Sequence, residues 1–454
     1  MKNQILFFFK LCIGVVAYSQ VNNPVCMENL SLFTQHAKVK NYEAAFTPWR
    51  QVRTTCPDIH IATYVYGERI LQHKIKTSGG SLKKNYITEL VGLYNDANKY
   101  FPKKYTLAST ATDKAILLYD NSSADTQSIY KILDQAFKKD LAGFNNPKGL
   151  YLYIASAIDL YRNRQKSLQE ILDIYDQVMD KIDHEKQKQL TIIDPLLSKE
   201  QNGILNRREQ RDLKQARAKK SNYNKVEASM EGKLGSIADC NKLMQLYSQN
   251  LESKKNDPEW LVRAATWLYK KECTNTALFD QVVMPLQYYP PTANSVFYLG
   301  LLYHKKNNPT NALNYYQKAI RDANNNYDRA QIALAIANQY KNLNQLENSR
   351  NFAQIALSYQ PSLGKAYLLI ANLYARSANA CGDSTFAKRA VYWLASKTAA
   401  LAKQVDPGLQ NEAIKASRSY SSRAPSKEEV TQSGMTGKTI HFSCWINGSI
   451  RVPD

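Results

Sequence analysis

The histidines of this chain do not form a catalytic or metal-binding pattern. No two of them have metal-ligand spacing on one helix, and neither an HExxH nor a GxSxG motif occurs. The six are His36, His60, His73, His184, His304 and His441. The sequence therefore predicts no catalytic residue, no metal site and no cofactor, and we expect a protein that is not an enzyme.

The cysteines are candidates for disulfide bonds. Besides Cys12 near the start of the chain there are six: Cys26, Cys56, Cys240, Cys273, Cys381 and Cys444. An even number of cysteines predicts three disulfides if the chain is exported to an oxidising compartment, and six cysteines allow fifteen connectivities. No pair has CxxC spacing, so neither a redox motif nor a zinc site is expected.

The first 19 residues are typical of a signal peptide. Lys2 precedes an apolar run, Ile5–Ala17, which Lys10 interrupts, and Ala17 and Ser19 form a small-x-small cleavage site. The alternative is an uncleaved N-terminal anchor, although the run is short for a membrane span. No later run is long enough to span, so we expect export to the periplasm or outer membrane, without a transmembrane segment in the mature chain.

Positive charge is concentrated in one central segment. The chain has a formal net charge of +21, and residues 198–225 hold nine Lys or Arg against three acidic residues. One interpretation is a surface for an anionic glycan or membrane, through Arg207, Arg208, Arg211, Lys214 and Arg217. The other is a solvated helix or linker. Export argues against nucleic acid as the partner.

The elements that must position these residues are helical. Residues 293–326 contain Leu299, Gly300 and Tyr303 on one helix, then Ala312 and Tyr316 on a second. This pattern resembles the tetratricopeptide repeat (TPR) family. Similar units start near residues 259, 293, 330 and 364, at steps close to the 34-residue period of the family. The resemblance implies an all-α fold: an α-solenoid of TPR-like helical hairpins.

The N-terminal part matches the repeat more loosely. Ala45, Trp49 and Val52 fit the second helix of one hairpin, and Tyr66-Gly67 fits the first helix of the next. Further helices are expected over about 106–119, 124–139, 147–163 and 167–190. Helix-breaking residues separate them, and the last of these lie at 194–195. A helix over 234–251 would precede the repeats near the C-terminus. The expected organisation is a signal peptide (1–19), an N-terminal array (20–195), a basic insertion or linker (196–233), a C-terminal array (234–405) and a cap (406–454).

The tail predicts a β-hairpin cap. Two β-prone runs flank Asn447-Gly448, a strong two-residue turn signal. Turn-like stretches precede them at 421–428 and 433–437. The repeat arrangement favours the pairs Cys26–Cys56, within one helical hairpin, Cys240–Cys273, between neighbouring helices, and Cys381–Cys444, which would hold the cap on the last repeat.

The resemblance also implies a ligand groove. In TPR proteins the first helices of successive repeats line a concave surface. The corresponding positions here are Phe297, Leu301, His304, Lys305, Leu334, Asn338, Lys341, Leu368, Asn372 and Arg376. Apolar residues stand where the carboxylate clamp of the family has Lys and Asn, so we expect an extended peptide or helix as ligand. The alternative is that these residues pack internally.

Repeats, export and the lack of a catalytic pattern together predict a scaffold. We expect a non-enzymatic protein-binding adaptor in the envelope of a gram-negative bacterium, with a protein partner whose identity the sequence does not give. The alternative is a protein that binds glycans or anionic polymers through the basic segment.

Overall fold

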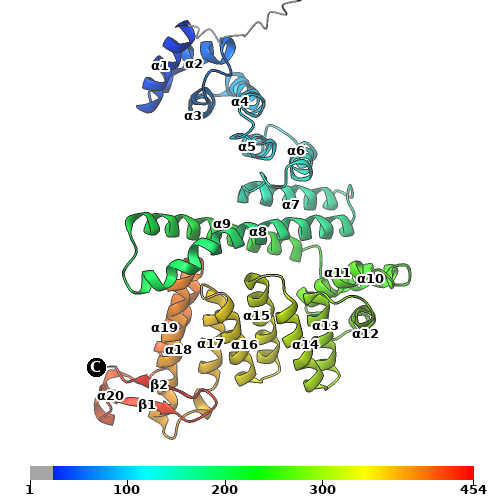
Figure 1. Cartoon of the computed structure of the whole chain (residues 1–454), viewed down its shortest axis with the longest axis vertical. Coiled ribbons are helices and arrows are strands. Elements are labelled where there is room, and N and C mark those ends of the chain that lie inside the picture. The colour runs from blue at the N-terminus through cyan, green and yellow to red at the C-terminus, as the bar shows by residue number, and fades with distance from the viewer. Residues whose placement is uncertain (1–23, 454) are drawn as a thin grey trace, which may run out of the picture. The chain divides into compact units, whose positions relative to one another are not determined.

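The computed structural model describes residues 24–453, so the expected signal peptide lies outside the described residues. The described part is helical apart from one two-stranded sheet. Figure 1 shows its helices in chain order, and they form two compact units that divide after Gly149. The expected boundary near residue 195 therefore does not coincide with the division between the units.

The N-terminal unit consists of antiparallel helical pairs. Its helices are α1 (Pro24–Lys38), α2 (Tyr42–Thr55), α3 (Ala62–Thr77), α4 (Gly80–Tyr100), α5 (Leu107–Asp120) and α6 (Thr126–Lys139). Trp49 is fully buried, and its indole nitrogen donates to the carbonyl oxygen of Thr63 at 2.7 Å. Gly67 lies directly against the Trp49 ring, so the Tyr66-Gly67 match marks a real close approach between α2 and α3.

Two long helices open the second unit after α7 (Pro147–Arg162). They are α8 (Leu168–Gln201) and α9 (Arg207–Gly235). They pack against each other through Ile193 and Leu197 on α8 and Leu213 and Ala216 on α9. The predicted helix end before Pro195 is wrong, because α8 continues through this proline. The segment expected as an insertion or linker is the second helix of this long hairpin.

The missed core face of α9 follows a helical period. Its buried side chains lie at 213, 216, 220, 223, 230 and 234, which are steps of three, four or seven residues. The predicted helix over 234–251 is also displaced. In the structure α9 ends at Gly235, and α10 (Cys240–Lys254) begins after Asp239, whose side chain caps it.

The repeat array follows α10, as Figure 1 shows. Its successive pairs are α11 (Pro258–Lys270) with α12 (Ala277–Val283), α13 (Ala293–Lys305) with α14 (Pro309–Asp322), α15 (Asn326–Asn342) with α16 (Leu346–Tyr359), and α17 (Gly364–Arg376) with α18 (Thr385–Val405). In the α13–α14 pair, a Cβ atom at Gly300 would lie 2.6 Å from ring carbons of the fully buried Tyr316. The small residue therefore permits the close helix contact that the repeat pattern predicts.

The C-terminus folds onto the last repeat. It contains α19 (Gln410–Ser421), α20 (Lys427–Ser433), β1 (Thr439–Phe442) and β2 (Gly448–Arg451). The strands pair antiparallel, with Phe442 opposite Gly448. The predicted two-residue turn is wrong, because residues 443–447 form a five-residue loop, which we call the Trp445 loop. Helix α20 was not expected and lies mainly between the two turn-like stretches, and the Ser426–Glu429 capping box explains its start.

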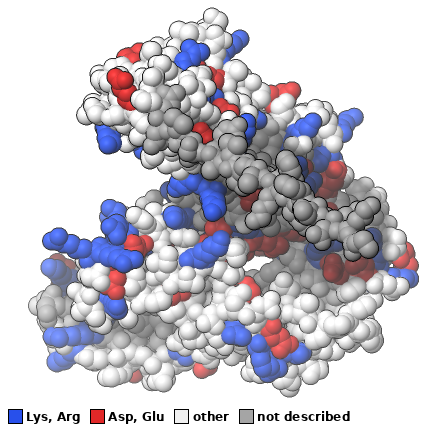
Figure 2. All heavy atoms as spheres, turned by 45° about the horizontal axis from the view of Figure 1, so that its top comes forward, with Lys and Arg blue, Asp and Glu red and all other residues white. Residues whose placement is uncertain are grey.

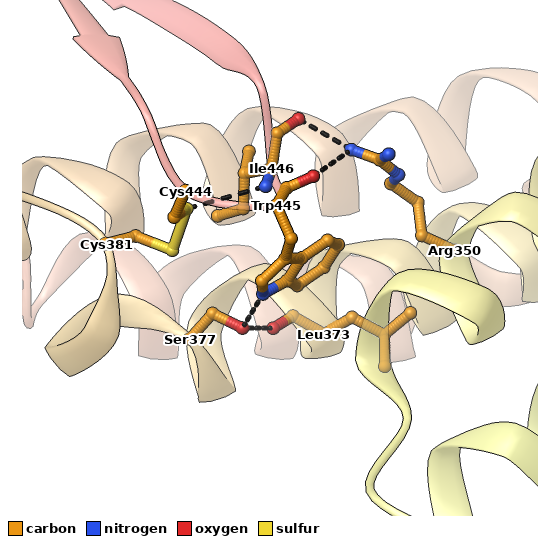
Figure 3. The surroundings of a disulfide bond; sticks show 7 residues. All are labelled: Arg350, Leu373, Ser377, Cys381, Cys444, Trp445 and Ile446. Atoms are coloured by element: carbon orange, nitrogen blue, oxygen red, sulfur yellow. Dashed lines mark hydrogen bonds between the residues drawn. A yellow bond between two sulfur atoms is a disulfide. The ribbon is translucent and has the colours of Figure 1, made fainter.

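The Trp445 loop is fixed to the repeats by several contacts (Figure 3). Arg350 on α16 donates to the carbonyl oxygens of Trp445 and Ile446 at 2.9 and 2.6 Å. The indole nitrogen of Trp445 donates to Ser377 at 3.1 Å. These contacts and the Cys381–Cys444 disulfide turn the loop toward the array, which accounts for its extra length.

The predicted fold class, an all-α solenoid of TPR-like hairpins with a small C-terminal β-hairpin, is confirmed. Adjacent antiparallel helices form the tight contacts in both units, and the strands occur only in the cap of the described chain. No helix among residues 24–453 is long and apolar enough to cross a membrane.

Candidate functional site

A cavity of about 990 Å³ lies inside the second unit, between the α8–α9 hairpin and the first helices of the repeats. Its wall contains side chains of α8, α9, α11, α13, α15 and α17 and of the segment after α18. A volume of this size is in the usual range for ligand pockets, so the cavity is the main candidate binding site of this unit.

Helix α8 contributes a row of carboxylates to the cavity. Asp176, Asp180 and Asp183 are separated by four and three residues, which places them on one face of the helix. Trp267 on α11 donates to Asp176 at 3.1 Å, and Tyr327 on α15 donates to Asp183 at 2.7 Å. These two hydrogen bonds connect the long helix to two different repeats and fix the direction of the row.

Lys186 on α8 lies among these carboxylates. The ammonium group of Lys186 lies 2.8 Å from Asp183 and 2.9 Å from Glu227 on α9. It also lies 5.9 Å from the centre of the Tyr327 ring. Burial opposes the charged form of Lys186, but Tyr327 and the two carboxylates outweigh this effect and raise the pKa of its ammonium group.

The remaining carboxylates at this end are less well compensated. Burial raises the pKa of Asp176 to about 6. Burial, and then the charge of Asp183, raise the pKa of Asp180. Burial likewise raises the pKa of Asp328 on α15, and the charge of Asp183 adds to this effect against a hydrogen bond from Asn325. Burial therefore disfavours their charged forms, and a cation beside them would reverse this.

Aromatic rings lie between these carboxylates. The cavity wall includes Tyr175, Tyr269, Phe297, Tyr298 and Tyr327. The ammonium group of Lys270 on α11 lies 5.5 Å from the centre of the Tyr175 ring. Rings and carboxylates together are groups that attract organic cations, through the ring face and through the full negative charge.

The far end of the cavity has different chemistry. There Lys220 on α9 forms a 2.6 Å ion pair with Asp406, which follows α18. Lys365 at the start of α17 also lines the cavity and is exposed. The cavity is therefore acidic beside α11 and α15 and basic beside α17.

The predicted groove residues do not gather around this cavity. Phe297 is the only one of the ten that lines it. Leu301 and Leu334 are buried, as the internal-packing alternative describes. Asn338 donates to the Leu334 carbonyl of its own helix, and Lys305 pairs with Asp280 at 2.7 Å.

The other predicted groove positions are dispersed. His304 is half-buried near Tyr316 and Tyr340. Burial lowers its pKa. Arg376 is exposed and donates to the side chain of Asn344 at 3.0 Å. Lys341 and Leu368 are half-buried, whereas Asn372 is exposed. A ligand role for these positions stays a prediction.

The predicted basic surface lies on the first turns of α9. Arg207, Arg208, Arg211 and Lys214 are exposed there. Arg217 is instead held by both oxygens of Glu200, at 2.6 and 2.7 Å, and donates to the Gln404 carbonyl oxygen at 3.1 Å. On the face drawn in Figure 2, Lys and Arg form separate groups among Asp, Glu and uncharged residues rather than one continuous basic field.

The cysteines lie in the three predicted pairs. The Cα–Cα distance is 6.4 Å for Cys26–Cys56, 5.8 Å for Cys240–Cys273 and 5.3 Å for Cys381–Cys444. These distances suit disulfides. Within residues 24–453, no group of three or more His, Cys, Asp or Glu side chains is arranged to hold a metal ion.

Sequence reasoning missed the acidic cavity. The spacing of Asp176, Asp180 and Asp183 indicates one polar helix face. Their hydrogen-bond partners are distant in the sequence: Trp267 follows Asp176 by 91 residues, and Tyr327 follows Asp183 by 144 residues. A single sequence contains no local signal for contacts at such separations.

Comparisons with known proteins give only distant similarity. No protein-family model matches the chain, and no curated protein matches it. A solved TPR protein from Parabacteroides merdae is 12% identical, with 68% of this chain and 97% of that chain covered and a TM-score of 0.25. Yeast Tom70 is 10% identical, with 90% and 93% covered and a TM-score of 0.28. Cut9, in the APC/C complex Cut9-Hcn1, is 10% identical, with 86% and 96% covered and a TM-score of 0.30.

Such low TM-scores and identities carry no argument about function. The TPR-like character rests on the paired helices of this chain and on close approaches such as that of Gly300 to Tyr316.

Proposed function

We propose that this chain is an exported, non-enzymatic scaffold that binds a segment of a partner protein in the cavity between the α8–α9 hairpin and the repeats. The observation that carries the proposal is the cavity of about 990 Å³, whose wall combines aromatic rings with charged side chains. A pocket with a few convergent polar groups on an otherwise packed helical frame is the usual form of a binding site.

Two features support export. The first 19 residues have the charge, apolar run and cleavage pattern of a signal peptide. The three cysteine pairs within disulfide distance suit an oxidising compartment. Together with the repeats, they favour a location in the periplasm or at the outer membrane of a gram-negative bacterium.

The packing of the predicted groove residues shifts the proposed binding surface. Leu301 and Leu334 are buried in helix contacts, and Asn338 bonds to its own helix. We therefore place the partner in the cavity rather than along the ten positions that the family pattern indicates.

Site-specific cross-linking tests this proposal. Asn294 is exposed and lines the cavity, whereas Leu313 is exposed on α14 and does not. A photoreactive amino acid would replace each residue in turn, and the purified full chain would be irradiated with an envelope extract of the source organism. We expect a discrete partner adduct from position 294 and none from position 313. Equal adducts at both positions, or none at 294, would contradict the proposal.

The alternative, an anionic polymer on α9, has less support because Arg217 is committed to Glu200 and Gln404. The two functions differ in salt dependence. A polymer held by exposed Arg and Lys should dissociate steeply as salt rises, because surface charges are screened within about 8 Å at physiological ionic strength.

A further inference from the structure

We propose that the acidic end of the cavity recognises a lysine or arginine side chain of the partner segment, held between Asp180 and Asp328. This inference rests on the proposed function, because it names the chemistry of the ligand in the same cavity. It commits to a cationic side chain on a peptide.

The charge balance of this end favours a cation. Six carboxylates of α8, α9 and α15 line it, against four cationic side chains of α8, α9 and α11. The carboxylates are Asp176, Asp180, Asp183, Glu227, Glu231 and Asp328, and the cations are Lys186, Lys225, Arg263 and Lys270. The acidic end therefore has an excess of negative charge inside a protein whose net charge is strongly positive.

The internal cations neutralise the proposed pair of carboxylates only in part, because the charge of Lys270 acts on Asp180 from beyond ion-pair distance. Lys186 is bound to Asp183 and Glu227. Lys270 lies over the Tyr175 and Trp267 rings, 5.5 and 5.1 Å from their centres. Neither Asp180 nor Asp328 is within ion-pair distance of a cation among the described side chains, and Asp328 has a hydrogen bond from Asn325 at 2.8 Å.

The internal lysines also show which ligand chemistry this wall accepts. Lys186 places its ammonium group against two carboxylates and near the face of Tyr327. A ligand lysine between Asp180 and Asp328 would likewise meet two carboxylates. Burial raises the pKa of Asp180, and Asp328 is close enough for its charge to add to this effect. Phe297 and Tyr298 also belong to the cavity wall.

The overall positive charge of the protein does not exclude such binding. At about 0.15 M salt, charges on the outer surface are screened within roughly 8 Å. The half-buried Asp328 is screened less, and Asp180, although exposed, faces the cavity. A cationic peptide is therefore repelled weakly at long range and attracted within the cavity.

The test compares two labelled peptides on the full chain at about 0.15 M salt. One is a fluorescein-labelled (Gly-Lys)₄ peptide, and the other is the same peptide with every lysine acetylated on Nζ. Fluorescence anisotropy should show saturable binding of the lysine peptide and at least tenfold weaker binding of the acetylated one. No saturable binding of the lysine peptide, or equal binding of both, would overturn the inference.

Variants locate the binding. The Asp180→Asn and Asp328→Asn substitutions together should lower the affinity for the lysine peptide at least tenfold. They should not disturb folding, because Asn has nearly the same shape as Asp, Asp180 is exposed and Asp328 is half-buried, and neither carboxylate has an ion-pair partner among the described side chains. The matched control is Asp212→Asn, which also removes one carboxylate from this unit but lies outside the cavity beside Arg208 and Arg211. It should leave the affinity unchanged, and an equal loss in this control would overturn the inference.

Failure here is distinguishable from failure of the proposed function. If position 294 still yields a partner adduct while the double variant binds the partner as tightly as the wild type does, the scaffold function stands and the cationic ligand is refuted.

Discussion

Replacing Gly300 with Ala tests whether close helix approach determines the repeat packing. The added Cβ atom would lie 2.6 Å from the Cδ1 and Cε1 atoms of Tyr316. Carbon atoms in ordinary contact are about 3.5 to 4.0 Å apart, so the ring would have to retreat by roughly 1 Å. Tyr316 is fully buried, and its ring centre lies 6.0 Å from that of Phe297 and 5.9 Å from that of Tyr340. It therefore has little room to move.

The magnitude follows from two opposing effects. Overpacking a filled core costs about 1 to 3 kcal/mol. Replacing glycine by alanine inside a helix returns about 0.5 to 1 kcal/mol. We therefore expect Gly300→Ala to lower the free energy of unfolding of the second unit by about 1 to 2 kcal/mol.

A matched control, Gly232→Ala, should change the free energy of unfolding in the opposite direction. Gly232 lies inside α9, is exposed, and has no atom within 4 Å of its added Cβ position. Gly232→Ala should gain only the higher helix propensity of alanine, without overpacking. It should therefore raise the free energy of unfolding by about 0.5 to 1 kcal/mol. The same chemical change is thus expected to destabilise one helix and stabilise another.

Urea unfolding followed by tryptophan fluorescence measures both effects. Four of the five tryptophans belong to the second unit, so the signal reports mainly on it. A double-mutant cycle isolates the contact: in a Tyr316→Ala background the ring is gone, and Gly300→Ala should no longer destabilise. If Gly300→Ala is neutral or stabilising in the wild type, or costs the same in the Tyr316→Ala background, the close-approach argument is refuted.

Three further substitutions have expected outcomes. Replacing Cys381 and Cys444 by Ser opens a loop of 63 residues and should lower the free energy of unfolding by up to about 4 kcal/mol, measured by urea unfolding against the wild type under oxidising conditions. Arg350→Met removes the two hydrogen bonds to the Trp445 loop and should cost about 1 to 3 kcal/mol, with a red shift of tryptophan emission; an unchanged spectrum would contradict this. The pKa of Asp176 is raised to about 6 by burial, so its contribution to stability is fully present below the unfolded value of about 3.9 and is lost as pH rises through 6. Asp176→Asn should therefore gain stability relative to the wild type, by up to about 2 to 3 kcal/mol between pH 4 and 7, and the opposite trend in urea midpoints would refute it.

The repeats were predictable because their determinants are local. Gly300 and Tyr316 are sixteen positions apart, and similar units start near residues 259, 330 and 364. The disulfide pairing followed from the same logic: Cys26 and Cys56 lie at the two adjacent ends of one antiparallel hairpin.

Helix α9 was misjudged for a different reason. Its many charges obscure a sparse core face that includes Leu213, Ala216 and Tyr223. This face suffices because α8, with 34 residues against 29 in α9, offers a continuous partner. Tertiary packing therefore compensates for the low apolar content of α9. The Trp445 loop was misjudged because a local turn signal, Asn447-Gly448, competes with distant anchors on Arg350 and Ser377.

The cavity could not be found by following the family pattern, because that pattern describes a groove lined by repeats alone. In this chain α8 and α9 supply a second wall across the first helices of the repeats. The hydrogen bonds from Trp267 and Tyr327 to the α8 carboxylates mean that side chains of the repeats face another helix instead of an open groove. A ligand must therefore satisfy both walls, and the charge of α8 contributes to its selection. A partner that binds repeat surfaces alone would be insensitive to Asp180, whereas a partner that enters this cavity would not be.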